Sequence, residues 1–532
     1  MAQASISATS NVTGLPRINP WVIAMTVTLA TFMEVLDSSI ANVALPHIAG
    51  TLGASPEEST WVITSYLVSS AVVLPMSGWL SNLFGRKRFY MTCVAIFTVS
   101  SLLCALAPSL PLLILFRILQ GAGGGGLQPT EQAILADTFS AKQRAMGFAM
   151  YGVAILVAPA IGPTLGGWIT DNYSWHWIFL INVPIGILSL ILTQRIVHDP
   201  DCLRDMANGN LRVDYAGIGL IVVGVGFLQY VLDKGQENDW FSSDAIVASL
   251  VIAIAALVLL VIRELTHENP IMDLRLLGKR NFATAVTFSF VLGMVLNGST
   301  VLLPQFLQND LGYTAQRAGM ALSPGAIVLA LMMPIAGILA SRFDPRIIIA
   351  SGFALTAFGL FHVTSIHVGV SFVTMVSYRV IQVIGIPLIF IRISTLNYVG
   401  VPRNKFNQVS GISNFLRNIG GGIGISLLNN FIAQQGQIHR SALTAHTNHA
   451  NPFFERQFQG TIQSFMAMGG GRAEASRRAL AQLSAQVDLQ SNVLSFANSF
   501  WILGFLILFL IPLPFLMRRP SPEEAKETAA MH

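Results

Sequence analysis

Apolar residues run through this chain in fourteen stretches of about 20 residues, each bounded by short polar segments. A run of that length crosses the hydrocarbon core of a bilayer as an α-helix. Fourteen long apolar runs also exclude a barrel, whose strands alternate apolar and polar residues. The pattern therefore predicts an all-α polytopic membrane protein whose spans lie near 20–42, 58–82, 89–108, 110–132, 145–170, 174–195, 213–233, 243–263, 282–304, 317–340, 346–366, 371–399, 408–433 and 493–517.

Three short motifs recur in the same order about 260 residues later, which indicates a duplicated half. Leu36-Asp37-Ser38-Ser39 returns as Leu296-Asn297-Gly298-Ser299. Gly78-Trp79-Leu80-Ser81 returns as Gly337-Ile338-Leu339-Ala340, and Phe116-Arg117-Ile118-Leu119-Gln120 returns as Tyr378-Arg379-Val380-Ile381-Gln382. In a membrane chain, duplicated halves suggest a transporter with its binding site at their interface.

The repeat and the number of spans together predict two six-helix halves with two helices inserted between them. We expect a cytoplasmic tail at 1–19, an N-terminal half at 20–195, connectors with the inserted helices at 196–281, a C-terminal half at 282–517 and a second tail at 518–532. The C-terminal half includes a polar outside loop at 434–492, in which residues 473–483 have the pattern of an amphipathic helix.

Composition agrees with a membrane location, because 53% of the residues are apolar and only 11% are charged. With the N-terminus inside, cytoplasmic segments hold 20 of the 31 Lys and Arg residues, so the positive-inside rule places both termini in the cytoplasm. The net charge of +5 then reflects topology and not a nucleic-acid surface. The first span carries acidic residues, so it is expected to be an anchor and not a cleaved signal peptide.

The sequence predicts neither a cofactor nor a metal site, and it predicts no enzyme. Cys93, Cys104 and Cys202 offer no disulfide framework, and the histidines lack a metal-ligand pattern. The glycine run from Gly121 to Gly126 is followed by no Lys-Ser/Thr and lies within a span, so it is not a phosphate loop. Without a nucleotide site, an ion gradient is the expected source of energy.

Glu34, Asp37 and Arg117 are charged residues within the spans of the first half, where an unpaired charge is costly. Glu34 and Asp37 share one helix face, and counting from the span ends puts them at nearly the depth of Arg117. One interpretation is a static ion pair that holds spans 1 and 4 together. The other is a proton-coupling site, in which Asp37 carries the proton, Arg117 modulates it, and Glu34 either shares that role or contacts substrate.

The second half keeps the arginine of the repeat but replaces the acid with Asn297, so proton coupling is expected in the first half only. Polar residues of the spans are candidates to line a substrate cavity between the halves: Glu34, Gln120, Asn297, Arg379, Gln382 and Arg417. For the arginines, pairing with lipid headgroups or helix ends is the alternative.

The ordered motifs resemble the major facilitator superfamily, and within it the fourteen-span drug:proton antiporters of the EmrB/QacA type, especially the EmrB branch. The resemblance covers residues 20–517 and rests on Leu36-Asp37 through Pro46, Gly78 through Arg86-Lys87, Arg117-x-x-Gln120-Gly121 and Gly162-Pro163-x-x-Gly166-Gly167. It implies a gating loop with Gly78, Asn82, Gly85 and Arg86, and a conformational hinge at Gly162, Pro163, Gly166 and Gly167. The segments 239–241 and 268–270 share this resemblance.

Two departures stand out. The loop motif of the family has an acid followed by a basic residue where this chain has Asn82 and Leu83, which weakens the expected charge relay between the halves. The hinge motif opens with Ala158 in place of glycine.

The resemblance implies an exporter of lipophilic drugs or toxic compounds, driven by protons and working by alternating access in a bacterial inner membrane. Such pumps act with a periplasmic adaptor and an outer-membrane channel, and the 434–492 loop is a candidate adaptor contact. A proton-coupled uptake symporter and an uncoupled channel or sensor on the same scaffold are the alternatives. The sequence leaves open the charge of the substrate, the proton stoichiometry, and whether Glu34 or Asp37 is the main proton carrier.

Overall fold

The computed structural model describes residues 19–517 apart from 141–142, 200–213, 236, 268–269, 446, 449–450 and 470. All regular secondary structure in these ranges is helical, which confirms the all-α prediction. The residues 1–18 and 518–532 of the predicted cytoplasmic tails, Cys202, and residues 268–269 of the family-like segment lie outside the described residues.

The N-terminal half begins at Pro20 and ends at Ile196. Its helices are α1 (Pro20–Leu52), α2 (Pro56–Ser59), α3 (Trp61–Phe84), α4 (Arg86–Ala105), α5 (Leu110–Gly124), α6 (Leu127–Thr138), α7 (Arg144–Asn172), α8 (His176–Leu180) and α9 (Asn182–Ile196). The inserted helices are α11 (Tyr215–Lys234) and α12 (Asp244–Thr266), with the short turns η1 (Trp240–Ser242) and η2 (Leu274–Gly278).

The C-terminal half follows. It consists of α13 (Arg280–Gln305), η3 (Phe306–Asp310), α14 (Ala315–Arg342), α15 (Pro345–Val363), α16 (Phe372–Val383), α17 (Ile386–Leu396), η4 (Arg403–Lys405), α18 (Phe406–Thr444), α19 (Pro452–Ala467), α20 (Arg472–Leu510) and η5 (Leu513–Leu516). The predicted domain boundaries at 195, 281 and 517 stay a prediction.

Twelve helical segments of the described chain are long and apolar enough to cross a membrane, and a bent pair within α7 raises the number to thirteen. The remaining predicted span, 408–433, lies in α18, a 39-residue helix that is not among these segments. Its sequence is rich in Gly, Ser and Asn, and many of these side chains are buried against other helices instead of facing lipid. The count of fourteen spans is therefore consistent with the structure without being confirmed by it.

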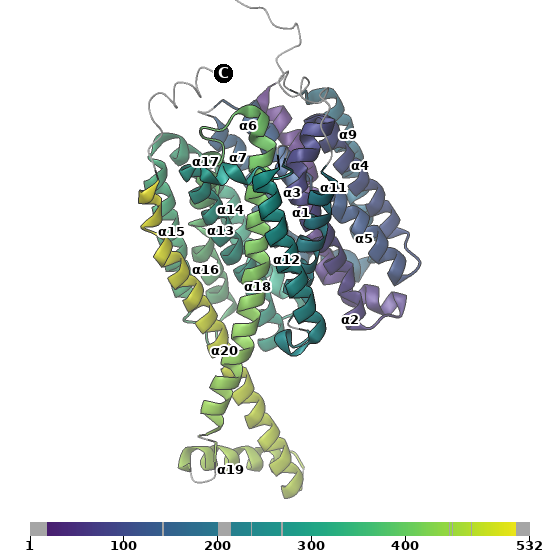
Figure 1. Cartoon of the computed structure of the whole chain (residues 1–532). Helices are drawn as coiled ribbons and strands as arrows, with labels where there is room; N and C mark the ends of the chain where they lie inside the picture. Colours follow the sequence, from purple (N-terminus) through teal and green to yellow (C-terminus); the bar gives the residue numbers. More distant parts are fainter. Residues whose placement is uncertain are drawn as a thin grey trace, which may run out of the picture.

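The helices form one bundle, from which a helical hairpin projects (Figure 1). The described chain ends at the side of the bundle opposite this hairpin, and we call the two sides the termini end and the hairpin end. The hairpin consists of the ends of α18 and α20 with α19 lying across them (Figure 1). The segment 434–492, expected to be a polar loop, is thus mostly helical, and the predicted amphipathic helix at 473–483 is confirmed as part of α20.

The duplication predicted from sequence is visible in the fourth span of each half, which is broken shortly after the repeated arginine, Arg117 or Arg379. In the first half α5 ends at Gly124 and α6 begins at Leu127, and in the second α16 ends at Val383 and α17 begins at Ile386. A Cβ on Gly125 would lie 2.5 Å from the Ser70 carbonyl oxygen, so only glycine allows this close helix packing.

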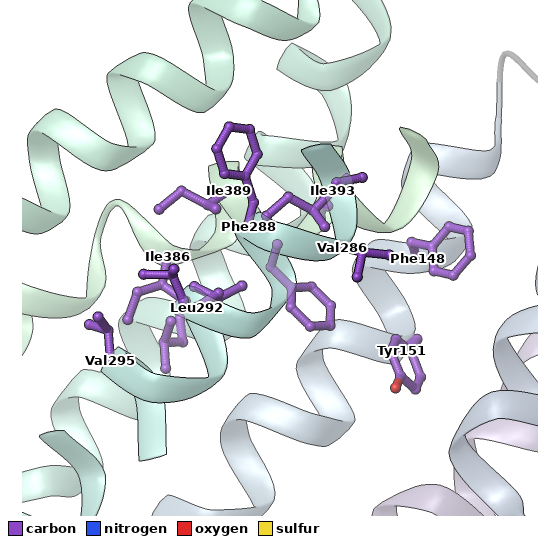
Figure 2. Close-up of a cluster of buried hydrophobic side chains, with 14 of the residues drawn as sticks. Phe148, Tyr151, Val286, Phe288, Leu292, Val295, Ile386, Ile389 and Ile393 are labelled. Atoms are coloured by element: carbon purple, nitrogen blue, oxygen red, sulfur yellow. The ribbon is translucent and has the colours of Figure 1, made fainter. Parts of the chain in front are cut away.

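The two halves meet in a continuous apolar core. Figure 2 shows Phe148 and Tyr151 of α7 beside a cluster of buried side chains from α13 and α17, including Phe288 and Ile389. Tyr151 also stacks on Phe390 with 5.9 Å between ring centroids. These contacts join α7 of the first half to helices of the second half, where aromatic pairs add to the stabilisation from burial.

The inserted helices lie beside this interface. α11 packs against α3 of one half and α18 of the other, and α12 packs mainly on α11. Much of α12 is exposed apolar surface, including Val251 and Ile262, which suits contact with lipid. Asp214 caps α11 by accepting from the Gly217 amide at 2.9 Å, and the Arg263 guanidinium of α12 donates to both of its oxygens.

This pair gives a testable pH dependence of stability. Hydrogen bonds from Arg263 lower the pKa of Asp214, so the carboxylate stabilises the fold above its ordinary pKa and loses that effect as the pH falls through the lowered value. We expect Asp214→Asn, which keeps the cap, to lower the free energy of unfolding by about 1 kcal/mol at pH 7, because Arg263 is partly exposed. Unfolding of the purified protein in detergent checks this, and an equal loss at pH 3 would contradict the charge-based explanation.

Candidate transport site

Asp37 lies in the interior of the N-terminal half and accepts hydrogen bonds from three side chains. The Arg117 Nη1 donates to its Oδ2 at 2.7 Å, while Gln120 and Asn182 donate to its Oδ1 at 3.1 and 2.5 Å. Ser101 accepts from the same two amides and completes the cluster. The contact between spans 1 and 4 expected from depth is present, and Asp37 is 2% exposed.

Arg117 is fully buried and is held from several directions. Besides Asp37, its guanidinium donates to the Val62 carbonyl at 3.0 Å and to Gln120 Oε1 at 2.7 Å. Its guanidinium carbon lies 4.3 Å from the ring centroid of Tyr66. The arginine therefore links α5 to α1 and α3, and its position depends on the charge of Asp37.

Glu34 lies one helical turn from Asp37 and has a separate set of partners. The Tyr66 hydroxyl donates to its Oε1 at 3.0 Å and the Gln128 amide donates to its Oε2 at 2.9 Å. Glu34 is buried, and no arginine or lysine of the described chain forms an ion pair with it. The two acids of the first span thus differ, because one is paired with a cation and the other is held by neutral donors.

Gln128 connects Glu34 to the opposite half. While its amide nitrogen donates to Glu34, its Oε1 accepts from Arg417 of α18 at 3.0 Å. Arg417 also donates to Asn414 at 2.5 Å and lies 5.6 Å from the Phe390 ring centroid. Arg417 is thus brought to the interface as expected, although its contact with the first half runs through a glutamine.

The corresponding residues of the second half do not form a matching cluster. Arg379 is buried, and it donates to Gln382 at 3.2 Å and to Thr300 at 3.4 Å. Asn297 is exposed and contacts Gly421, without a hydrogen bond to Arg379 among the described contacts. The asymmetry expected from the Asp37-to-Asn297 difference is therefore present in the geometry.

The glycines of the expected hinge face α1 of the same half. A Cβ on Gly162 would clash with the Ser39 side chain, and one on Gly166 would lie 3.0 Å from Ile40 Cγ2, whereas Gly167 has more space. Ser39 Oγ also donates to the Pro159 carbonyl at 3.0 Å, a group left free by the prolines of α7. With Pro159 and Pro163 in the helix, α7 bends by 45°. The bend lies beside the residues of the expected hinge, and the role of these residues in conformational change stays a prediction.

The expected gating loop lies at the termini end, where α3 meets α18. Gly78 allows the backbones to touch, because its Cβ would lie 2.7 Å from Gln408 Cα. Asn407 donates to Ser81 at 2.6 Å beside it. These contacts close the interface between the halves at the termini end.

Arg86 points to α6 and not across the interface. It pairs with Asp137 and donates to the Ala133 carbonyl at 3.2 Å, so both of its partners belong to the same half. The Oδ1 of buried Asn82 has no hydrogen-bond partner among the described residues. Gly85 adopts a φ of +84°, which favours glycine and lets α4 begin with Arg86. No acid thus stands at position 82, where the family motif has one. Arg86 pairs with Asp137 instead.

A substitution at Gly78 tests the closed contact. We expect Gly78→Ala to disfavour closure at the termini end by about 1–3 kcal/mol, because the methyl group meets backbone atoms of α18 that cannot move aside. A thiol reagent should then label a cysteine at Ser410 faster in the Gly78→Ala background. Gly219→Ala is the matched control, since no atom lies within 4 Å of its Cβ position, and equal labelling in both would contradict the closure.

Several residues of this region escaped the sequence reasoning. Asn182 and Ser101 complete the Asp37 cluster, Gln128 links the halves, Asp137 pairs with Arg86, and Glu131 is a third buried acid of the first half. The acidic type of Glu131 within a predicted span was a usable signal. Single amides and serines inside apolar helices give none, because such residues are common there.

The fold and the site define a secondary transporter, because two halves of membrane-crossing helices meet around buried charged side chains. The part of the chain that the structure describes holds no cluster of potential metal ligands. The chain belongs to the Major Facilitator Superfamily, whose sequence pattern matches residues 27–425. This membership makes the protein a transporter of small substrates and not an enzyme.

Two relatives and one solved structure illustrate the similarity. The multidrug export protein EmrB of Haemophilus influenzae is 36% identical over 493 residues, covering 92% of this chain and 94% of that protein. The fatty acid resistance protein FarB of Neisseria gonorrhoeae is 33% identical over 500 residues, covering 94% of this chain and 96% of that protein. The human organic anion transporter MFSD10 superposes with a TM-score of 0.57 at 13% identity over 92% of this chain and all of that one, which supports the fold alone.

Proposed function

We propose that this protein exports lipophilic compounds in exchange for protons by alternating access. The observation that carries the proposal is the buried Asp37–Arg117 pair with its amide donors, because it makes the first half sensitive to a single proton. Relatives named for multidrug export and for fatty acid resistance support the direction of transport and the kind of substrate.

The surroundings of Asp37 connect its protonation to a rearrangement. All three of its partners donate hydrogen bonds, so they satisfy the ionised carboxylate. A protonated carboxyl would direct its O–H at a donor and would leave the Arg117 charge without a partner. Because an unpaired buried charge is costly, proton binding at Asp37 favours a different arrangement of α1 and α5.

The chain from Glu34 through Gln128 to Arg417 supports a coupling between the halves. A charged Glu34 holds the Gln128 nitrogen, which leaves the Gln128 oxygen for Arg417. Protonation of Glu34 or an anionic group near Arg417 would remove one side of this bridge. The bridge thus offers a way for proton or substrate binding to loosen the interface.

We place the protein in a bacterial inner membrane with both termini in the cytoplasm, as the distribution of Lys and Arg favours. In that orientation the contact between Gly78 and Gln408 lies on the cytoplasmic side. The conformation described here is then the one in which the cytoplasmic side is closed.

Proton flux in everted membrane vesicles tests the proposal. The vesicles are energised to an acidic interior, and a panel of lipophilic compounds is added, including the cation tetraphenylphosphonium and the carboxylate oleate. Proton release from the vesicles that requires both a compound and the protein supports antiport and identifies substrates. The panel covers both charges because the first half offers buried acids and the second offers Arg379 and Arg417.

The alternatives give different results in the same vesicles. Substrate and protons moving in the same direction would establish a symporter and overturn the proposal. Substrate flux that follows its own gradient, indifferent to pH and to Asp37→Asn, would establish a channel-like protein. With no proton release for any compound, direct measurement of radiolabelled compound separates these two outcomes from antiport of a substrate outside the panel.

We also propose that the helical hairpin binds a periplasmic adaptor, which in turn contacts an outer-membrane channel. The hairpin has its own small core, in which Phe458 and Ile462 of α19 pack on Ala475, Ala479 and Leu483 of α20. It also leaves large apolar side chains exposed, among them Phe453 at 77% and Met468 at 78%. A folded element with exposed apolar groups, projecting from the bundle, suits a protein contact.

Removing the tip of the hairpin tests this contact. Arg440 pairs with Asp488 at 2.8 Å across the hairpin, so residues 445–483 can be replaced by a short Gly-Ser linker above that pair. We expect the shortened protein to keep flux in vesicles and to lose export from whole cells. Phe453→Ser with Met468→Ser, which spares the small core, should weaken cellular export in the same way. Undiminished cellular export by the shortened protein would contradict the docking role.

A further inference from the structure

Glu131 of α6 is a buried carboxylate to which the proposed transport cycle gives no role so far. Its side chain is fully buried, and Oε1 accepts from the Thr28 hydroxyl of α1 at 2.6 Å. Its Oε2 has no hydrogen-bond partner among the described residues, and no ion pair to it is present there. An ionised carboxylate in such a place is strongly disfavoured, so a proton on Glu131 fits this conformation.

The neighbours of Glu131 come from four helices. α1 contributes Glu34 and the Thr31 hydroxyl, which is buried and lacks a partner of its own among the described residues. Tyr90 of α4 and Tyr151 of α7 are the other titratable groups of this region, and their hydroxyls bond to the Val27 carbonyl and to the Gln132 amide. Arg417 of α18 directs its hydrogen bonds to Gln128, Tyr151 and Asn414. None of these neighbours is a cation held against the Glu131 carboxyl.

A row of polar side chains on α1 runs from Asp37 toward the termini end. Glu131 of α6 bonds to Thr28 at the far end of this row. Thr28, Thr31, Glu34 and Asp37 are spaced three residues apart over roughly 13 Å, so each lies beside the next on the helix surface while the whole row winds about half a turn around α1. Their partners follow the same order on the fourth span, with Arg117 and Gln120 at Asp37, Gln128 at Glu34, and Glu131 at Thr28. Polar side chains of α1 and of the fourth span therefore follow one another from the Asp37 cluster to Glu131.

The next residue along α6 connects this end of the path to the closed interface. Gln132 exchanges two hydrogen bonds with Asn414 of α18, at 3.2 and 3.0 Å. Opening the halves at the termini end must break these bonds, because they join α6 of one half to α18 of the other. Water then reaches the side of α6 that carries Glu131, and a proton held there can leave.

We propose that Glu131 is a second proton-binding carboxylate of the transport cycle, protonated while the termini end is closed and deprotonated when it opens. In the step that releases the proton, the Glu131 O–H bond breaks and water at the termini end accepts the proton. The inference rests on the proposed proton antiport, and it adds a proton-releasing group on the side from which substrate is taken up.

Carbodiimide labelling of the wild-type protein tests whether Glu131 titrates. Dicyclohexylcarbodiimide reacts with protonated carboxyls in apolar surroundings, and peptide mass spectrometry locates the product. We expect Glu131 to be labelled at pH 6 and much less at pH 9. Labelling that is equal at both pH values would show a permanently neutral, structural residue and would overturn the inference. This readout does not depend on a known substrate or on the proposed function.

Transport by Glu131→Gln tests whether that proton is used. With tetraphenylphosphonium or oleate, whichever the wild type transports, we expect gradient-driven efflux to fall about tenfold or more while exchange of substrate without a gradient persists. Glu264→Gln is the matched control, because Glu264 is also fully buried with one unpartnered oxygen but lies in α12, away from the path. It should keep wild-type efflux.

The outcomes separate this inference from the proposed function. Wild-type efflux and an unchanged number of protons per substrate in Glu131→Gln, together with loss of coupling in Asp37→Asn, would overturn the role of Glu131 alone. A wild-type protein whose flux ignores the proton gradient would overturn the antiport itself. If Glu131→Gln fails to fold, the pH-dependent labelling of the wild type still decides whether Glu131 binds a proton.

Discussion

Asp37→Asn is expected to abolish proton-driven efflux while the protein still inserts into the membrane. The amide has nearly the shape of the carboxylate, but it cannot bind and release a proton and does not balance the charge of Arg117. Leaving a buried partner unpaired costs about 3–5 kcal/mol, so a drop in stability should accompany the loss of coupling. Proton release in everted vesicles and unfolding of the purified protein measure the two effects.

The second half already shows the result of such a change. There Asn297 stands in place of the acid, and Arg379 bonds to Gln382 and Thr300 instead. Asp233→Asn is a suitable control, because Asp233 is an acid of the inserted helix α11 that bonds to Thr64 outside the Asp37 cluster. Normal uphill efflux by Asp37→Asn, or equal loss in the control, would exclude Asp37 as the coupling residue.

Arg117→Ala should have an effect of similar size for the complementary reason. It removes the cation that balances Asp37 and empties a fully buried site between α1, α3 and α5. Gln120 and Asn182 remain as donors to the carboxylate, but they are neutral. We expect coupled efflux to be lost and the free energy of unfolding to fall by about 3–5 kcal/mol.

A double variant separates the stability effect from the coupling effect. Asp37→Asn with Arg117→Gln removes both charges and keeps groups that can form hydrogen bonds to each other. The double variant should recover much of the stability lost by either single variant, because neither charge is left unpaired. Coupled efflux should stay absent. Recovery of efflux together with stability would mean that the pair is only a structural link between spans 1 and 4.

The sequence supported the position of the ion pair because depth in a membrane follows from counting residues. Each helical residue rises by about 1.5 Å, so Asp37 and Arg117 could be placed at one level from the ends of their apolar runs. Comparison of the repeated motifs predicted that Asn297 would break the symmetry, and among the described residues Arg379 bonds to Gln382 and Thr300 and not to Asn297. For the segment 434–492 the polar composition indicated a connection outside the apolar spans, and the structure shows that this connection is mostly helical.

The partners of these charges could not be found by counting. Asn182 bonds to Asp37 across 145 positions of sequence, and Arg417 bonds to Gln128 across 289. Helical periodicity tells which residues share a face, but not how that face is rotated relative to a neighbouring helix. That rotation follows from side-chain packing between helices, including the close contacts at Gly78 and Gly162.

By itself, then, the sequence determined that the chain is a duplicated helical membrane protein with buried charges concentrated in its first half. The hydrophobic effect and the need to satisfy every backbone hydrogen bond in lipid make those properties readable from local pattern. Only the tertiary structure decided that Asp37 is surrounded by donors, that Glu34 reaches the other half through Gln128, and that Glu131 is left without a cation. These depend on the packing and rotation of helices far apart in the chain, which no local pattern encodes.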